Sequence, residues 1–421
     1  MEGNRLSADL DQFLADCEQE LIGFRRSLHA HPEPGYAELR TTRLVAQRLT
    51  AAGLHPVPLA GGAGLLVEIG ATQDQEKPDH PERSVVALRA DLDALPLADE
   101  KEVPYRSTVP GVCHACGHDV HTTVLLGTGL FLAAQAKAGL LPGRVRLIFQ
   151  PAEEIGTGAQ DVIAAAGLAS VGRIFALHCD PRLDVGKIGI RSGPITAACD
   201  HIKVTVTGPG GHTARPHLTA DVVYALGKIV TELPAALSRL VDPRSSLSLV
   251  WGRISAGSAA NAIPGEGIAE GTIRSLDDEA WRAAPGLVEA LVRSVATPYG
   301  VTAELEYVPR DPPTINEEAS AQMFAVAAAA VLGQDSVAST PQSLGAEDFA
   351  WYLSSVPGAL ARLGTRTPGA TLVRDLHQPT FDVDERAIAV GVRVMAATAL
   401  TALWDNGSVV GESLAPASAG T

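Results

Sequence analysis

Cysteine is scarce in this sequence of 421 residues, with five thiols at Cys17, Cys113, Cys116, Cys179 and Cys199. An odd number of thinly scattered thiols in a large chain does not indicate a disulfide framework. We therefore expect reduced cysteines. A cysteine with a function is then a metal ligand or a nucleophile rather than a cross-link.

Aromatic residues and net positive charge are lacking as well. Aromatics make up 4% of the sequence, and the formal net charge is −15. These values argue against aromatic stacking on nucleic acid and against a polyanionic partner. No run of 18 apolar residues occurs, and the stretch MEGNRLSADLDQFLADCEQE has no apolar core of the signal-peptide type. We expect a cytoplasmic protein with no nucleic-acid or membrane partner.

Apolar strands and helices alternate along the chain. The content of 46% hydrophobic and 19% charged residues is typical of a globular protein, and the length predicts two domains. Apolar runs typical of buried strands occupy residues 84–92, 144–154 and 173–180. Helical patterns occupy residues 8–30, 41–54 and 121–139. The alternation predicts an α/β fold with a mixed, largely parallel sheet.

Ionisable residues gather where three of these predicted strands end. Asp91 and Asp93 lie at the end of the first strand, Glu153 and Glu154 at the end of the second, and His178 at the end of the third. In open α/β sheets ligands bind at the carboxyl ends of strands. We therefore expect these five residues to share one crevice, although they are far apart in the sequence.

The pattern changes near residue 200. Strands of alternating polarity and helices follow in the order β-α-β-β-α-β, which is typical of a ferredoxin-like layer with one open sheet face. We predict a catalytic domain at residues 1–193 and 309–405, interrupted by this domain at residues 194–308. Residues 71–83 read as a solvated loop and residues 406–421 as a mobile tail.

The stretch GVCHACGHDVHTT, residues 111–123, concentrates ligand chemistry. Cys113 and Cys116 could be half of a structural zinc site, but no second Cys-x-x-Cys follows. A redox dithiol has no further support, and we interpret Cys113 as a buried, inert thiol. Cys116 and His118 flank a glycine before a buried helix and can face one cation. Asp119 and His121 could orient these ligands.

Five stretches give the chain a family resemblance: HACGHDVHTT, FQPAEEIGTGA, ALHCDPRLDVGKI, GPGGHTARPH and LHQPTFDVDE. With them the sequence resembles the aminoacylase/carboxypeptidase metallopeptidase superfamily from about His29 to about Ala397. More narrowly it resembles the branch of N-acyl-amino-acid (hippurate-type) hydrolases and plant auxin-conjugate hydrolases. Each stretch alone is moderately specific, and five in the right order are highly specific.

The resemblance implies a site with two divalent metal ions per subunit, Zn²⁺ or Mn²⁺. It assigns the metal ligands to Cys116, His118, Glu154, His178 and His377. Glu153 is implied as the general base. Asp93 and Asp119 are expected to orient the metal ligands without binding the metal themselves.

The resemblance also gives the inserted domain a role, as a ferredoxin-like dimerisation and lid domain of a homodimer. His212 is implied to reach into the active site of the partner subunit and polarise the scissile carbonyl. Asn261 and Arg274 match positions that bind the carbonyl and the carboxylate of the substrate.

We therefore predict a metal-dependent amidohydrolase that cleaves the amide of an N-acyl amino acid or a small peptide. A dipeptidase or carboxypeptidase on the same scaffold stays open, as do a non-catalytic metal-binding protein and a thiol oxidoreductase. The intact Glu153 argues against a mere metal-binding protein, which needs no base. Departures from the family pattern concern substrate identity and lie at Ile155, Thr157, Cys179 and Asp180.

Overall fold

The computed structural model describes residues 2–70 and 85–405 and divides them into two compact units. The first unit comprises the chain up to Gly193, Asn316–Thr340, and the chain from Tyr352 onward. The second comprises Pro194–Ile315 and Pro341–Trp351. The predicted loop at 71–83 and the predicted tail at 406–421 lie outside the described residues.

Among the described residues, the first unit contains a mixed sheet of eight strands. In spatial order they are β1 (Val57–Pro58), β2 (Leu65–Ile69), β4 (Val145–Gln150), β3 (Val85–Asp91), β5 (Val171–Asp184), β16 (Gly358–Arg366), β6 (Ile188–Ile190) and β15 (Val337–Ser339). The pairs β3/β4, β3/β5, β5/β16 and β6/β15 are parallel, and the pairs β1/β2, β2/β4 and β6/β16 are antiparallel. The prediction of a largely parallel sheet is confirmed.

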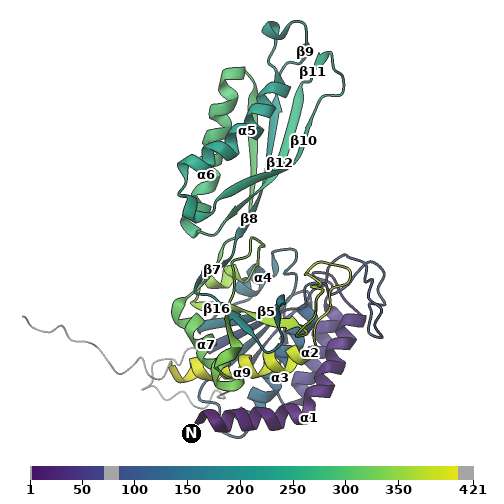
Figure 1. Cartoon of the computed structure of the whole chain (residues 1–421), viewed down its shortest axis with the longest axis vertical. Helices are drawn as coiled ribbons and strands as arrows, with labels where there is room; N and C mark the ends of the chain where they lie inside the picture. Colours follow the sequence, from purple (N-terminus) through teal and green to yellow (C-terminus); the bar gives the residue numbers. More distant parts are fainter. Residues whose placement is uncertain (1, 71–84, 406–421) are drawn as a thin grey trace, which may run out of the picture. The chain divides into compact units, whose positions relative to one another are not determined.

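The helices of the first unit cover this sheet (Figure 1). They are α1 (Glu2–Ala30), α2 (Leu39–Ala51), α3 (His118–Lys137), α4 (Gly158–Ala164), α7 (Glu318–Leu332) and α9 (Arg386–Asp405). The short α8 (Ala350–Leu353) begins in the second unit, ends in the first and precedes β16. Every residue of α3 from His118 to Gly129 is buried, and the predominance of apolar residues around most of the helix predicts such burial. Helix α9 is long and apolar enough to span a membrane, but its most apolar window is 72% buried inside the protein. Such burial is typical of a core helix.

The parallel strands bring their carboxyl ends to one edge, and this edge positions the site. Strand β3 ends at Asp91 and its neighbour β4 at Gln150. Strand β5 pairs with β3 only up to Ala176, opposite Arg89, and then continues to Asp184. His178 therefore lies within β5, two residues beyond the last pair with β3, rather than at the end of the strand as predicted.

Within the described residues, the second unit contains a four-stranded antiparallel sheet in the order β10-β12-β8-β13. The bounds are β8 (Ala198–Thr207), β10 (Ser248–Ala256), β12 (Glu266–Ser275) and β13 (Thr302–Asp311). Helices α5 (Val222–Leu240) and α6 (Asp278–Ala296) pack on one face (Figure 1). This is the predicted β-α-β-β-α-β order along the chain, while the assignment as a ferredoxin-like dimerisation and lid domain stays a prediction.

Local signals explain the two helices of this unit. The side chains of Asp221 and Asp277 accept the N–H groups of Tyr224 and Ala280, and so cap the first turns. Apolar residues recur every three or four positions and face the sheet, at Val222, Ala225, Leu226, Ile229, Leu233 and Leu237 in α5.

Two short strand pairs complete the described structure. Strands β9 (Gly211–His212) and β11 (Ala262–Ile263) pair with each other within the second unit. Strands β7 (Gly193–Thr196) and β14 (Thr314–Asn316) form the second pair, at two of the points where the chain passes between the units.

Candidate metal centre

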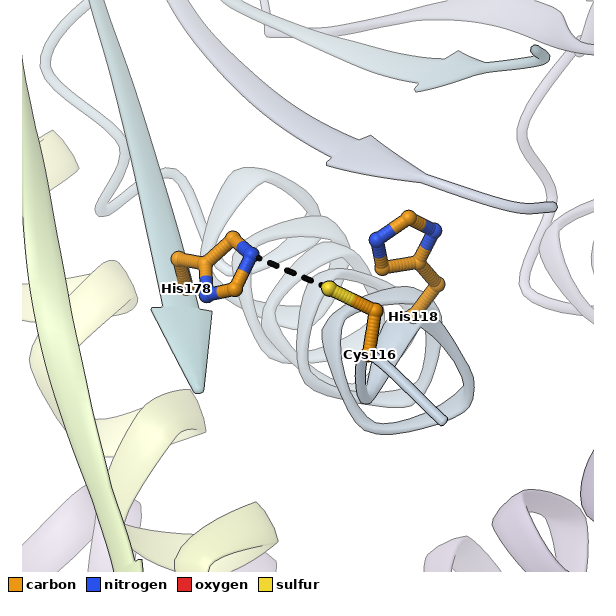
Figure 2. Close-up of side chains that lie close together, drawn as sticks. All are labelled: Cys116, His118 and His178. Atoms are coloured by element: carbon orange, nitrogen blue, oxygen red, sulfur yellow. Dashed lines mark hydrogen bonds between the residues drawn. The ribbon is translucent and has the colours of Figure 1, made fainter. Parts of the chain in front are cut away.

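Cys116 and His118 are placed by a left-handed glycine. Gly117 has φ 91° and is the N-terminal cap residue of α3. A Cβ atom at this position would lie 2.8 Å from Sγ of Cys179, so only glycine fits. The turn brings Sγ of Cys116 to 3.5 Å from Nε2 of His178, which projects from β5 (Figure 2).

The tautomer of His178 follows from its second nitrogen. Nδ1 donates to the carbonyl oxygen of Cys179 at 2.8 Å, which leaves the lone pair of Nε2 directed toward Cys116. Burial holds the pKa of His178 well below its usual range, and the charge of Arg362 lowers it further. A neutral imidazole with a free Nε2 lone pair is the form that binds a metal.

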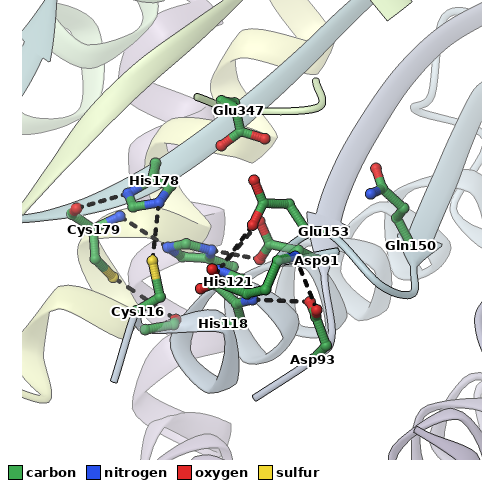
Figure 3. Close-up of polar contacts among 12 residues, drawn as sticks. Asp91, Asp93, Cys116, His118, His121, Gln150, Glu153, His178, Cys179 and Glu347 are labelled. Carbon is green, nitrogen blue, oxygen red and sulfur yellow. Dashed lines mark hydrogen bonds and ion pairs between the residues drawn. The ribbon is translucent and has the colours of Figure 1, made fainter. Parts of the chain in front are cut away.

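His118 lies among carboxylates in the same cluster (Figure 3). Its Nδ1 is 3.2 Å from Oδ1 of Asp93, while Nε2 is 3.8 Å from carboxylate oxygens of Asp91, Glu153 and Glu154. The Nε2 atom is buried and has no hydrogen-bond partner among the described residues. Burial alone would lower the pKa of His118, but the charge of Asp91 and the contact with Asp93 outweigh it and raise the pKa to about 10. The cluster therefore attracts a cation.

His377 joins the cluster from the segment before α9. Its backbone has φ 61°, and its N–H donates to the carbonyl oxygen of Ala115 at 2.8 Å, which ties this segment to the turn at Cys116. Nε2 of His377 is 3.4 Å from Oε1 of Glu154. The contact with this carboxylate raises the pKa of His377.

The structure thus brings together all five residues that were predicted as metal ligands. Ligand atoms within 4.8 Å of one another form two groups that share Cys116, namely Cys116, His118 and His178, and Cys116, Glu154 and His377. Thiolate, imidazole and carboxylate donors in this mixture suit Zn²⁺ or Mn²⁺. Nε2 of His118 is buried and has no hydrogen-bond partner among the described residues, and binding a metal would satisfy it. The donor set therefore fits a divalent metal.

Asp91 and His121 form the support beneath this cluster. Nδ1 of His121 is 2.6 Å from Oδ1 of Asp91, and Nε2 accepts the backbone N–H of Cys179 at 2.8 Å (Figure 3). Both ring nitrogens are therefore engaged. This contact holds the backbone next to His178, so that His121 positions β5.

The carboxylate of Asp119 points to α1. It is 2.7 Å from Nε of Arg25 and 2.7 Å from Nδ1 of His29, and all three side chains are completely buried. Burial would raise the pKa of Asp119, but Arg25 and His29 hold it well below its usual range. That Asp119 orients the metal ligands stays a prediction.

The three other predicted site residues belong to the second unit. His212 lies on β9 and Asn261 directly precedes β11, and both are exposed. The carbonyl oxygen of Asn261 accepts the N–H of Thr213 at 3.3 Å, so this strand pair holds the two residues close together. Arg274 lies on β12 and donates to the carbonyl oxygen of Leu344.

Roles for Arg25 and His29 were not predicted from the sequence. A signal was present, because residues four apart on a predicted helix share one face, and a cation there next to apolar positions indicates a buried ion pair. Glu38 was also missed, although it is completely buried. Nothing in its local sequence separates it from an exposed helix-start glutamate.

Known proteins of similar sequence cover most of this chain. A protein from Rhodococcus jostii (strain RHA1), named provisionally as a glutamate–cysteine ligase, is 46% identical over 389 residues, which are 92% of this chain but 47% of that protein. The chain therefore spans about half the length of this relative. N-acetylcysteine deacetylase from Bacillus subtilis (strain 168) is 35% identical over 384 residues, covering 91% of this chain and 97% of the relative.

A solved structure and a family profile also match most of this chain. The crystal structure of a dinuclear metal-binding peptidase of the M20 family from Bacillus subtilis aligns with a TM-score of 0.79 and 32% identity, covering 93% of this chain and 99% of that one. Residues 87–401 match the profile of peptidase family M20/M25/M40. The chain belongs to the M20/M25/M40 peptidase family.

Proposed function

We propose that this protein is a metal-dependent amidohydrolase that cleaves the amide bond of N-acyl amino acids. The observation that carries the proposal is the convergence of one thiol, three imidazoles and the Glu153–Glu154 pair in one cluster of overlapping groups, in which Nε2 of His118 is buried without a hydrogen-bond partner among the described residues. Membership of a peptidase family and similarity to a protein named N-acetylcysteine deacetylase support this substrate class.

The five predicted ligands would hold two divalent ions, Zn²⁺ or Mn²⁺. Bound divalent ions lower the pKa of a coordinated water and polarise a carbonyl group. Asp93 fixes the ring of His118 and also accepts the backbone N–H of Glu154 at 3.0 Å. It therefore orients two of the ligands at once.

Glu153 is the general base of the proposed reaction. Its Oε2 lies 3.8 Å from Nε2 of His118, and its side chain is 10% exposed. A carboxylate at this place takes a proton from the attacking water and returns it to the leaving nitrogen. The adjacent Glu154 faces His118 and His377 and is left to bind metal.

The second unit supplies the proposed substrate contacts. Nδ1 of His212 accepts the N–H of Ala214 at 3.0 Å, so in the neutral ring Nε2 carries the proton. An exposed Nε2–H can donate to the developing oxyanion across a homodimer, a contact worth about 3–4 kcal/mol of barrier. Arg274 would bind the substrate carboxylate with its planar fork, and Asn261 the carbonyl.

We place the enzyme in the cytoplasm. Among the described residues all five cysteines are free, and four of them are buried. A ligand thiol at Cys116 requires a reduced side chain, which the cytoplasm maintains.

The test is hydrolysis of a panel of N-acetyl, N-benzoyl and indole-acetyl amino acids and of dipeptides, with Mn²⁺ or Zn²⁺ and with a chelator. Glu153→Gln is expected to lower kcat by a factor of about 10² to 10⁴ and to retain metal binding. The exposed Glu102→Gln is the matched control and is expected to keep full activity. Turnover that survives complete metal removal, or an active Glu153→Gln protein, would refute the proposal.

A further inference from the structure

The segment between α1 and α2 contains a glutamate that does not serve its own helix. Glu38 is the N-terminal cap residue of α2, yet its side chain makes no capping hydrogen bond. Glu33 caps the helix instead, because its Oε1 and Oε2 accept the N–H groups of Arg40 at 2.9 Å and Thr41 at 2.8 Å. The Glu38 carboxylate is thereby directed elsewhere.

Its partner lies 114 residues further along the chain. Oε1 of Glu38 accepts the backbone N–H of Ala152 at 2.7 Å. Both residues are completely buried. A buried N–H group must be hydrogen-bonded, and in this loop Glu38 satisfies that of Ala152.

Ala152 has an unusual backbone conformation directly before the Glu153–Glu154 pair. Its φ is 55°, in the left-handed region that a residue with a Cβ atom rarely adopts. Such a conformation persists only where the surroundings hold it. The peptide that Glu38 binds is therefore the one that directs the catalytic pair out of β4.

The rest of the segment packs on the same loop. A Cβ atom at Gly35 would lie 2.5 Å from Cδ1 of Ile155 and 3.2 Å from Cα of Ala152, so the two backbones are in close contact. The hydroxyl of Tyr36 is 2.7 Å from Oγ1 of Thr157 and donates to Asp161 at 2.6 Å. The loop is held on both sides of the Glu153–Glu154 pair.

Burial of Glu38 is unfavourable by itself. It raises the pKa of this carboxyl to about 7, although the N–H group of Ala152 lowers it. Oε2 of Glu38 has no hydrogen-bond partner among the described residues. Capping of α2 does not explain why this carboxylate is buried here, whereas its hydrogen bond with Ala152 does.

We infer that Glu38 is a positioning residue: by accepting the N–H of Ala152 it fixes the left-handed turn that directs Glu153 and Glu154 at the metal cluster. The inference rests on the proposed function for its effect on turnover. Its effect on metal affinity is independent of turnover, because Glu154 is a predicted ligand. Glu38 acts through Ala152 and does not touch the reacting atoms.

The test compares Glu38→Gln, which keeps an oxygen acceptor of the same size, with Glu38→Met and Glu38→Ala, which have none. We expect Glu38→Met and Glu38→Ala to lower kcat by about 10- to 100-fold with KM within threefold, since small displacements of catalytic groups have effects of this size. Mn²⁺ titrated into the metal-free full-length protein should show a Kd about tenfold higher. Glu38→Gln should stay within threefold of wild type in both measurements.

Val45→Ala, a truncation in the buried face of α2, is the matched control for lost stability. It should lower the melting temperature without changing the Kd for Mn²⁺. Unchanged kcat and Kd in folded Glu38→Met would overturn the inference, and so would a Glu38→Gln protein as impaired as Glu38→Met. A wild type without turnover whose Kd for Mn²⁺ still rises in Glu38→Met would refute the proposed function and retain the positioning role.

Discussion

Nδ1 of His118 lies 3.2 Å from Oδ1 of Asp93, inside the protein and away from solvent. The other oxygen of the same carboxylate accepts the N–H of Glu154. We predict that Asp93→Ala raises the Kd for Mn²⁺ by about 10- to 100-fold, because both ligands lose their orientation. Asp93→Asn should lose less, since an amide oxygen still accepts one of the two hydrogen bonds. Isothermal titration of metal-free protein measures both.

Asp16→Asn serves as the control for this series, because Asp16 lies on the exposed side of α1. Its Kd should equal that of the wild type. An Asp93→Ala protein with wild-type metal affinity would show that the carboxylate does not orient the ligands.

The buried ion pair between Arg25 and Asp119 gives a prediction for stability. The Arg25 guanidinium also lies 3.2 Å from Asp382 and 3.4 Å from Glu385, so it joins α1, α3 and the segment before α9. We expect Arg25→Met to lower the free energy of unfolding by about 3–5 kcal/mol, because it removes the guanidinium charge beside the buried Asp119 and leaves His29 as the neighbour of this carboxylate. Chemical denaturation of the metal-free protein measures this change.

Arg26→Met is the matched control on the next residue of the same helix. The Arg26 side chain is 48% exposed and pairs with Glu385, which is one of the carboxylates near Arg25. An exposed pair contributes at most about 1 kcal/mol. Equal losses of unfolding free energy in Arg25→Met and Arg26→Met would contradict a larger contribution from the buried pair.

The sequence was sufficient to predict the sheet and the crevice. Continuous apolar runs indicate strands that are buried on both faces, and β3 is buried at every position. Because neighbouring parallel strands end at one edge, Asp91, Glu153 and His178 could be expected to converge. That argument needs only strand order and periodicity.

The direction of individual side chains could not be predicted in this way. His178 was expected at the end of a strand, but β5 continues to Asp184, because β16 still pairs with it beyond the end of β3. The contacts of Arg25 with Asp119 and of Glu38 with Ala152 join residues 94 and 114 positions apart. Periodicity reports the buried face of one element, whereas such contacts depend on how separate elements pack.

Asp311 in the second unit gives a prediction for the pH dependence of stability. Burial raises its pKa to about 6 from the usual 3.8; the charge of Arg310 opposes this shift and that of Glu347 adds to it. The folded state binds this proton more tightly than the unfolded chain does. The contribution of Asp311 is therefore fully present below pH 4 and is lost as the pH rises through 6.

The shift corresponds to about 2–3 kcal/mol at most. Asp311→Asn should remove this part of the pH dependence of stability. The free energy of unfolding of the variant, relative to that of the wild type, should therefore rise between pH 4 and pH 8. Urea denaturation at a series of pH values measures the difference. Glu279→Gln, at an exposed position in the first turn of α6, should leave this pH dependence unchanged. Parallel curves for wild type and Asp311→Asn would contradict the assignment.

Gly117 links the fold of the first unit to its metal affinity. The residue separates Cys116 from His118 at φ 91°, and a Cβ atom there would be 2.8 Å from Sγ and 3.0 Å from Cβ of Cys179. In Gly117→Ala the backbone either stays in the left-handed region, at a cost of about 1–2 kcal/mol, and displaces Cys179, or it leaves that region. Both responses move a predicted ligand or the residue beside His178. We expect the Kd for Mn²⁺ to rise at least tenfold and the melting temperature to fall.

Gly23→Ala tests the same chemical change where nothing opposes it. Gly23 lies on the exposed side of α1, and a Cβ atom there meets no atom within 4 Å. Since alanine is the better helix former, this variant should be more stable by about 0.5–1 kcal/mol, with unchanged affinity for Mn²⁺. If Gly117→Ala instead bound Mn²⁺ as tightly as Gly23→Ala, the turn between Cys116 and His118 would not set the geometry of the metal site.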